Sequence, residues 1–220
     1  FSGDGIEIEA GSDNNTIAGN YIGRLTQAGA DAGAGEGNTG SGIRVLGANN
    51  VIGGVLAADR NVIAGNNNDG VTITGAGASG NQLRGNWIGI DAAATVELAN
   101  GAQGVYIGDG AFNNTVGGTA AGAGNVIGGA TFAGVEIRGA GTTGNRIEGN
   151  FIGTDATGSL NFGNGNNGIY LVAGATGNTI GGTASGTGNL IAFNADRGIV
   201  LQDTATTGNA FLGNTIFSNG

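Results

Sequence analysis

The 220-residue chain contains no cysteine, histidine, lysine, methionine or proline, and these absences exclude several classes of function. Without His, Cys and Lys, the usual catalytic bases and nucleophiles are missing. Ten Asp and six Glu against seven Arg give a net charge of −9. Because binding to nucleic acid depends mainly on cationic contacts to phosphate, we expect no nucleic-acid partner. The lack of Cys is compatible with any compartment.

Long apolar runs are also missing. No stretch has the length and apolar character of a membrane span or a signal peptide, so we expect no membrane insertion by this segment. Aromatic residues are 5% of the chain and 51 residues are Gly, a composition that could suggest disorder. The regular spacing of the apolar residues argues instead for a folded repeat.

An Asn followed two residues later by an apolar residue recurs along the whole chain. The last six of its seven copies recur about every 32 residues, a period typical of a solenoid. Asn side chains stacked on successive coils can bond to one another and to the backbone, so we interpret them as structural. The seven are Asn15, Asn50, Asn81, Asn114, Asn145, Asn178 and Asn209.

Two more phrases recur seven times each. One is Gly, apolar, any, apolar, first at Gly5 and last at Gly198; the other is Asn, any, apolar, from Asn20 to Asn214. Apolar residues alternate with period two, so each phrase predicts a short strand with one buried face. Three strands per turn and seven turns predict an all-β parallel β-helix. We expect residues 1–220 to form a single segment of it.

Successive coils alternate between a longer form, such as the one from Gly70 to Gly104, and a shorter form, such as the one from Gly104 to Gly134. In the long coils the extra residues follow the third strand, in 91–103 and 155–167. In the short coils they lie between the second and third strands, in 117–124 and 181–188. We expect these stretches to be surface loops, where added length costs little.

The two ends carry near copies of one phrase, in residues 1–5 and 217–220. An unpaired strand edge recruits further strands. We therefore expect this segment to continue into further repeats or to associate end to end with a second copy, in a head-to-tail contact that does not close.

The phrases in residues 60–66, 149–158 and 178–183 resemble right-handed parallel β-helix repeats, in particular those of large secreted and cell-surface bacterial proteins. The resemblance covers nearly the whole chain. It implies a right-handed solenoid of bacterial origin, located outside the cell or on its surface. Related β-helices serve as adhesin stalks, polysaccharide lyases and hydrolases, and phage spikes, so the resemblance alone does not decide function.

We expect a structural role, as a rigid shaft, adhesin stalk or filament subunit without catalysis. The alternative is a polysaccharide-binding or polysaccharide-degrading β-helix, for which acidic and basic residues gathered in one groove would be the sign. The sequence indicates no such cluster. Glu136 and Glu148 fall on different strands and different faces of one coil, so they form no obvious pair for glycoside hydrolysis, and we interpret them as solvated charges.

The outward row of the third strand is unusually apolar. Two interpretations remain open: the long loops cover it with Val96, Leu98, Leu160 and Phe162, or it is a docking or carbohydrate-stacking surface. This candidate contact surface comprises Tyr21, Val62, Trp87, Val126, Phe151 and Leu190.

We expect no cofactor and no catalytic residue. The one metal to consider is Ca²⁺, which prefers oxygen ligands. Asp91 and Asp155 share a sequence context and occupy equivalent positions two coils apart along the solenoid. No denser group of acidic residues accompanies them, so we interpret both as turn-stabilising residues rather than as calcium ligands.

Overall fold

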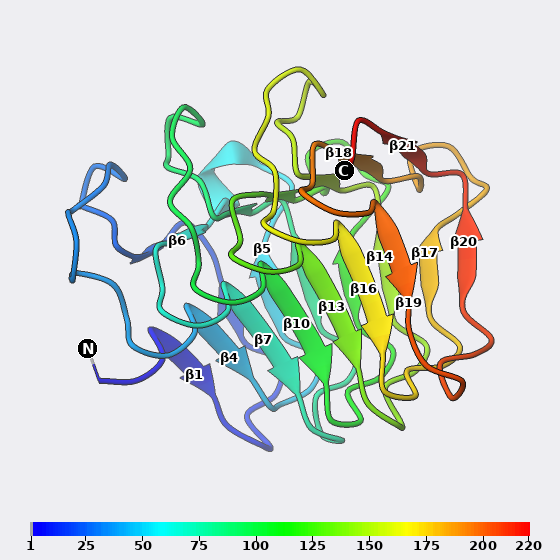
Figure 1. The fold of residues 1–220 in the computed structure, drawn as a ribbon. Coiled ribbons are helices and arrows are strands. Elements are labelled where there is room, and N and C mark those ends of the chain that lie inside the picture. The colour runs from blue at the N-terminus through cyan, green and yellow to red at the C-terminus, as the bar shows by residue number, and fades with distance from the viewer. Residues whose placement is uncertain (1) are drawn as a thin grey trace.

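The computed structural model describes residues 2–220 as a right-handed parallel β-helix of seven coils with three strands per coil (Figure 1). Each predicted phrase forms a strand, and strands of the same phrase pair in parallel with the next coil. A single 3-10 turn, η1 (Ala57–Asp59), interrupts the strands and turns of the described residues. The predicted fold class is confirmed.

The three phrases build three seven-stranded sheets, named here sheets A, B and C. Sheet A contains β1 (Ile6–Ile8), β4 (Ile43–Val45), β7 (Val71–Thr74), β10 (Val105–Gly108), β13 (Val135–Arg138), β16 (Ile169–Val172) and β19 (Ile199–Leu201). Sheet B contains β2 (Thr16–Ile17), β5 (Val51–Gly53), β8 (Gln82–Arg84), β11 (Thr115–Gly117), β14 (Arg146–Glu148), β17 (Thr179–Gly181) and β20 (Ala210–Leu212). Sheet C contains β3 (Tyr21–Gly23), β6 (Val62–Ala64), β9 (Trp87–Ile88), β12 (Val126–Ile127), β15 (Phe151–Ile152), β18 (Leu190–Ala192) and β21 (Thr215–Phe217).

The core is a set of aliphatic stacks that follow the strand register. Ile107 is aligned with Ile73 on one side and Ile137 on the other, and all three are fully buried. Burial of one such side chain contributes about 2 kcal/mol, and the seven coils repeat this contribution along the rod. The alternation within the three phrases predicts one inward-facing row per sheet, and six of the residues that it places there are completely inaccessible: Ile73, Leu83, Ile88, Ile107, Val116 and Ile127.

The Asn residues form hydrogen-bonded ladders with one direction. The backbone N–H and the side-chain Nδ2 of Asn114 both donate to Oδ1 of Asn145, at 3.0 Å each. Nδ2 also donates to the Ala78 carbonyl at 2.9 Å, and Oδ1 accepts two bonds from Asn81. Every polar atom of this buried side chain is therefore bonded, as burial of an amide requires.

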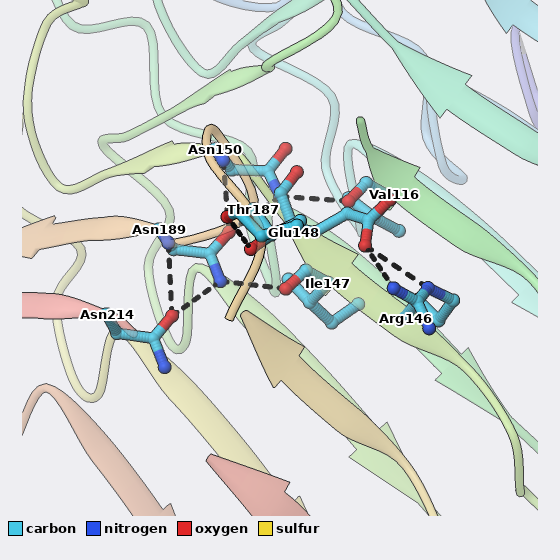
Figure 2. A network of polar contacts seen from close by, with 9 residues as sticks. Val116, Arg146, Ile147, Glu148, Asn150, Thr187, Asn189 and Asn214 are labelled. Atoms are coloured by element: carbon cyan, nitrogen blue, oxygen red, sulfur yellow. Dashed lines mark hydrogen bonds and ion pairs between the residues drawn. The ribbon is translucent and has the colours of Figure 1, made fainter. Parts of the chain in front are cut away.

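A second ladder lies at the corner between sheets B and C, and here too each Asn donates hydrogen bonds to the Oδ1 of the Asn in the next coil. Figure 2 shows Asn189 pointing at the Asn214 oxygen and at the Ile147 carbonyl, with bonds of 2.9 and 2.7 Å. This ladder comprises Asn20, Asn61, Asn86, Asn125, Asn150, Asn189 and Asn214.

A third ladder, not predicted from the sequence, runs along the corner after sheet C. It is interrupted at one coil, where Ala130 takes the place of Asn and only its backbone N–H reaches Asn164. The other members are Asn38, Asn66, Asn100, Asn164, Asn194 and Asn219.

Sheet B strands end in a glycine corner that brings successive coils into close contact. Gly117 has φ of +92°, in the left-handed region that favours glycine. A Cβ at this position would lie far inside van der Waals contact of the Glu148 carbonyl oxygen in the next coil. The corner therefore requires glycine for both its conformation and its spacing.

Candidate functional site: a polar furrow on sheet A and a loop-covered face on sheet C

Two adjoining hollows lie on the outer face of sheet A, the sheet at the front of Figure 1. Their volumes are about 580 Å³ and about 330 Å³, and both are lined by Gln103 and Glu136. Together they form one continuous depression, which we call the sheet A furrow. It reaches from Asp4 beside the first coil to Gln202 beside the last.

Glu136 stands at the centre of the furrow on β13. Its side chain accepts a hydrogen bond from Gln103 and a 3.0 Å charge-assisted bond from Arg138. Only 4% of Glu136 is exposed, so the expectation that it is a solvated charge is wrong. The carboxylate points out of the sheet, but Gln103 and its neighbours enclose it. The bond to Glu136 also raises the pKa of Arg138.

Asp69 occupies the neighbouring part of the furrow, in the turn before β7. It accepts hydrogen bonds from the Thr72 hydroxyl at 2.8 Å and from the backbone N–H of Gln103 at 3.0 Å. Burial raises the pKa of the Asp69 carboxyl, and the charges of Glu136 and Asp4 raise it further despite these hydrogen bonds. Gln103 thus contacts both carboxylates and holds them in one network.

Aromatic side chains lie beside the acidic network. Tyr106 on β10 and Tyr170 on β16 occupy the same register position as Glu136, one coil to either side of it. The Tyr106 ring lies across Gly108, where a Cβ would collide with it, so this glycine allows the ring to rest on the sheet. Burial raises the pKa of the Tyr106 hydroxyl, as do the charges of Asp109 and Glu136.

The furrow overturns the expectation that acidic and basic residues do not gather in one groove. Its larger hollow contains four carboxylates and two guanidinium groups: Asp4, Asp69, Asp109, Glu136, Arg44 and Arg138. These residues are far apart in sequence and come together because strands of the same sheet stack coil upon coil.

Glu148, in contrast, faces away from this network, on sheet B. It binds Arg146 at 2.7 Å, as the close-up in Figure 2 shows, and is 8% exposed. Glu148 is therefore a buried, paired charge rather than a solvated one. As predicted, Glu136 and Glu148 do not form a pair.

The candidate contact row of sheet C is aligned in register from Tyr21 through Leu190. Tyr21 is 48% exposed, whereas Val62 and Val126 are buried at 3% exposure. Trp87, Phe151 and Leu190 are half-buried. The accessible part of the row is thus limited to the residues other than the two valines.

The long loops and the residues that flank them account for the burial of Val126. Three of these loops rise from the same side of the rod in Figure 1, at residues 24–37, 91–97 and 155–161. Ile90 and Phe162 pack on Val126, and Ala94 joins the same cluster. Of the expected covering residues, Leu98 and Phe162 are buried while Val96 and Leu160 stay exposed. An apolar hollow of about 210 Å³ remains between the second and third loops.

The indole ring of Trp87 is also in contact with a cationic side chain, that of Arg60. The Arg60 guanidinium lies 4.1 Å from the centre of the indole ring, within the range of a cation–π contact. Burial lowers the pKa of Arg60. The role of the sheet C row as a contact surface stays a prediction.

Asp91 and Asp155 each close one of these loops. Oδ1 of Asp155 accepts bonds from the backbone N–H groups of Ser159 and Leu160, both at 2.8 Å, and Asp91 makes the equivalent pair with Thr95 and Val96. Burial works to raise the pKa of Asp155, but these bonds and those from Thr157 outweigh it and lower the pKa to about 2. Both carboxylates act within their own turns.

Within residues 2–220, no three Asp, Glu, His or Cys side chains converge on a position that could hold a metal ion. The same residues contain no helix that is long and apolar enough to cross a membrane. Comparisons with protein-family models, with curated proteins and with solved structures gave no match to this chain.

Proposed function

We propose that this β-helix is a structural repeat module, a rigid shaft of an extracellular or cell-surface protein. The observation that carries the proposal is the run of asparagine ladders along the rod. Asn114 is typical of the buried ladder residues: it binds the next coil through two hydrogen bonds to Asn145 and the preceding coil through a third, to Ala78. Because each coil of a solenoid contacts only its neighbours, the bonds between adjacent coils are the ones that oppose bending and unravelling.

The direction of the ladders supports stacking of further coils. Among the described residues, no hydrogen bond reaches Oδ1 of Asn15, and none leaves the backbone N–H of Asn209. One terminal coil therefore presents acceptors and the other presents donors. A further coil, from the same chain or from a second copy, would extend the ladder in register, head to tail.

An extracellular location is supported by the resemblance to secreted and surface-located bacterial repeats and by the acidic, Gly-rich and Asn-rich composition. A shaft role requires no chemistry, and we propose that the module carries out none. Purified chain incubated with neutral and acidic polysaccharides is expected to release no reducing-end or unsaturated products. Products that disappear in the Glu136→Gln variant would contradict a purely structural role.

Rigidity is tested by pulling the chain between its two ends in single-molecule force spectroscopy. We expect the rod to resist and then to lengthen in steps that correspond to single coils. Extension at low force without steps would contradict the shaft proposal.

Stacking is tested separately, by electron microscopy and light scattering of concentrated protein. We expect rods longer than one chain, and the Thr215→Lys variant, with a cation at the edge of the last coil, should shorten them. The Ser185→Lys variant adds the same charge on an exposed loop and serves as the control. Strictly monomeric parent protein would contradict end-to-end association.

A further inference from the structure

The sheet A furrow is independent of the ladders and has a chemistry of its own. It extends over seven coils, about 30 Å at the usual spacing of neighbouring strands. Unlike sheet C, it is not covered by the long loops, which rise from another side of the rod (Figure 1). Its floor consists of outward side chains of successive strands, so a long, extended ligand would match its shape.

The charges of the furrow exclude a polyanionic ligand. Its larger hollow contains four carboxylates against two guanidinium groups, and both of these are already paired, Arg138 with Glu136 and Arg44 with Glu7. The whole chain carries a net charge of −9. A phosphate backbone or a chain of uronic acids would therefore be repelled.

The sheet also gives a peptide backbone little to bind. The strands of sheet A are paired on both sides along the rod, as β10 is with β7 and β13. An extended peptide lying across the face would find few free backbone groups, so strand addition is limited to the ends of the rod and does not occur in the furrow.

Sugar rings fit the groups that remain. Tyr106 and Tyr170 stand two coils apart, about 10 Å along the axis, with Glu136 aligned between them and Gln103 beside it. Phe132 adds an aromatic side chain at the rim and is 51% exposed. Aromatic faces pack against the apolar faces of sugar rings, while carboxylates and amides bind hydroxyl groups at their edges.

We propose that the sheet A furrow binds a neutral oligosaccharide that lies along the axis of the rod. Tyr106 and Tyr170 pack against two of its rings, and Gln103, held in place by its hydrogen bond to the buried Glu136, binds the hydroxyl groups between them. The furrow, rather than the loop-covered row of sheet C, is the carbohydrate-binding face of this molecule.

Isothermal titration calorimetry with four hexasaccharides tests the proposal: cellohexaose, mannohexaose, N-acetylchitohexaose and hexagalacturonate. We expect at least one of the three neutral chains to bind and hexagalacturonate to bind at least about tenfold more weakly. Tyr106→Ala and Tyr170→Ala should each weaken the neutral ligand about tenfold, the effect of removing an aromatic anchor. The Glu136→Gln variant should narrow the difference between neutral and acidic chains.

Tyr21→Ala is the matched control, because it removes an exposed tyrosine from sheet C, and it should bind as the parent does. Circular dichroism confirms that each variant is folded, and Tyr106→Phe, which keeps the ring, should retain binding. The proposal is overturned if no neutral hexasaccharide binds at millimolar concentration, or if Tyr21→Ala abolishes binding while the two furrow variants leave it intact. It would also fail if the acidic chain bound best. None of these results bears on the rigidity of the shaft.

Discussion

Replacing Asn114 with Ala tests how much an internal ladder contributes to stability. Asn114 is fully buried in the fourth of seven coils. Its Oδ1 accepts the backbone N–H and the Nδ2 of Asn81, both at 2.9 Å. Its Nδ2 donates to Asn145 and to Ala78. Alanine would remove all four of these bonds and keep only the backbone bond to Asn145.

The largest cost comes from the donors left without acceptors. Asn81 would lose the partner of its backbone N–H and of one side-chain N–H, both in a buried environment. Each buried donor without a partner costs about 1–3 kcal/mol. The two acceptors on the other side keep alternative donors, since Phe112 also reaches Ala78. We therefore expect Asn114→Ala to lower the free energy of unfolding by about 3–5 kcal/mol.

Equilibrium unfolding in guanidinium chloride, followed by circular dichroism, measures this cost. Asn15→Ala is the matched control: Asn15 lies on the same ladder but is exposed, and its Oδ1 accepts no bond within the described residues. We expect this variant to lose less than about 1 kcal/mol. The hydrogen-bond argument is refuted if the free energies of unfolding of the two variants differ by less than about 0.5 kcal/mol, which is the usual error when the effects of distant mutations are added.

Three further predictions concern other sites. Ala130→Asn should complete the third ladder and raise the free energy of unfolding by about 1 kcal/mol, because the Nδ2 of Asn100 would gain a second acceptor beside the Ile63 carbonyl. Thermal unfolding measures this, and a loss of stability would mean that the corner has no room for the larger side chain. Gly117→Ala should cost at least about 3 kcal/mol, through strain and collision with the next coil, whereas Gly75→Ala, also at positive φ but facing open space, should cost about 1 kcal/mol; equal losses would refute the packing argument. The pKa of Asp69 is raised above its ordinary value of 3.8 in the folded state, so the folded protein binds this proton more tightly than the unfolded chain does. Its stability relative to the Asp69→Asn variant should therefore fall as the pH rises from 3.8 to the raised pKa. Parallel curves of stability against pH for the two proteins would contradict this linkage.

The sequence predicts the repeated parts of the fold because their causes are local and periodic. Alternation of apolar residues identifies β10 and β13, and the loops that follow the third strand fall where the coil lengths indicate. The third ladder is harder to find because Ala130 breaks its pattern and because Asn66 and Asn100 lie in loop-like surroundings. A search for Asn five residues after each Asn of the second ladder finds Asn66, Asn194 and Asn219, although the long loops shift Asn38, Asn100 and Asn164 to greater distances.

The furrow could not be predicted in the same way, since its residues share no spacing. Asp69 and Glu136 come from coils that are not adjacent and lie in different parts of them, one in a turn and one on a strand. They become neighbours only because Gln103, from the coil between them, reaches both carboxylates. The alternation of side chains along a strand shows that Glu136 points out of the sheet. Whether its carboxylate is exposed to solvent depends on the side chains that surround it, which the alternation does not reveal.

Two periods act in this molecule, and they have different physical roles. The one-coil period sets the core stacks and the ladders, because every coil must pair with the next. The two-coil period separates Trp87 from Phe151, Asp91 from Asp155 and Tyr106 from Tyr170. A loop after every third strand would crowd its neighbours at the spacing of about 4.8 Å between coils, so loops on alternate coils leave room for each one to fold over sheet C. The same alternation keeps the two tyrosines of sheet A about 10 Å apart, with a polar coil between them. The long loops that cover sheet C thus recur at the same two-coil spacing as the two tyrosines on the uncovered face of sheet A.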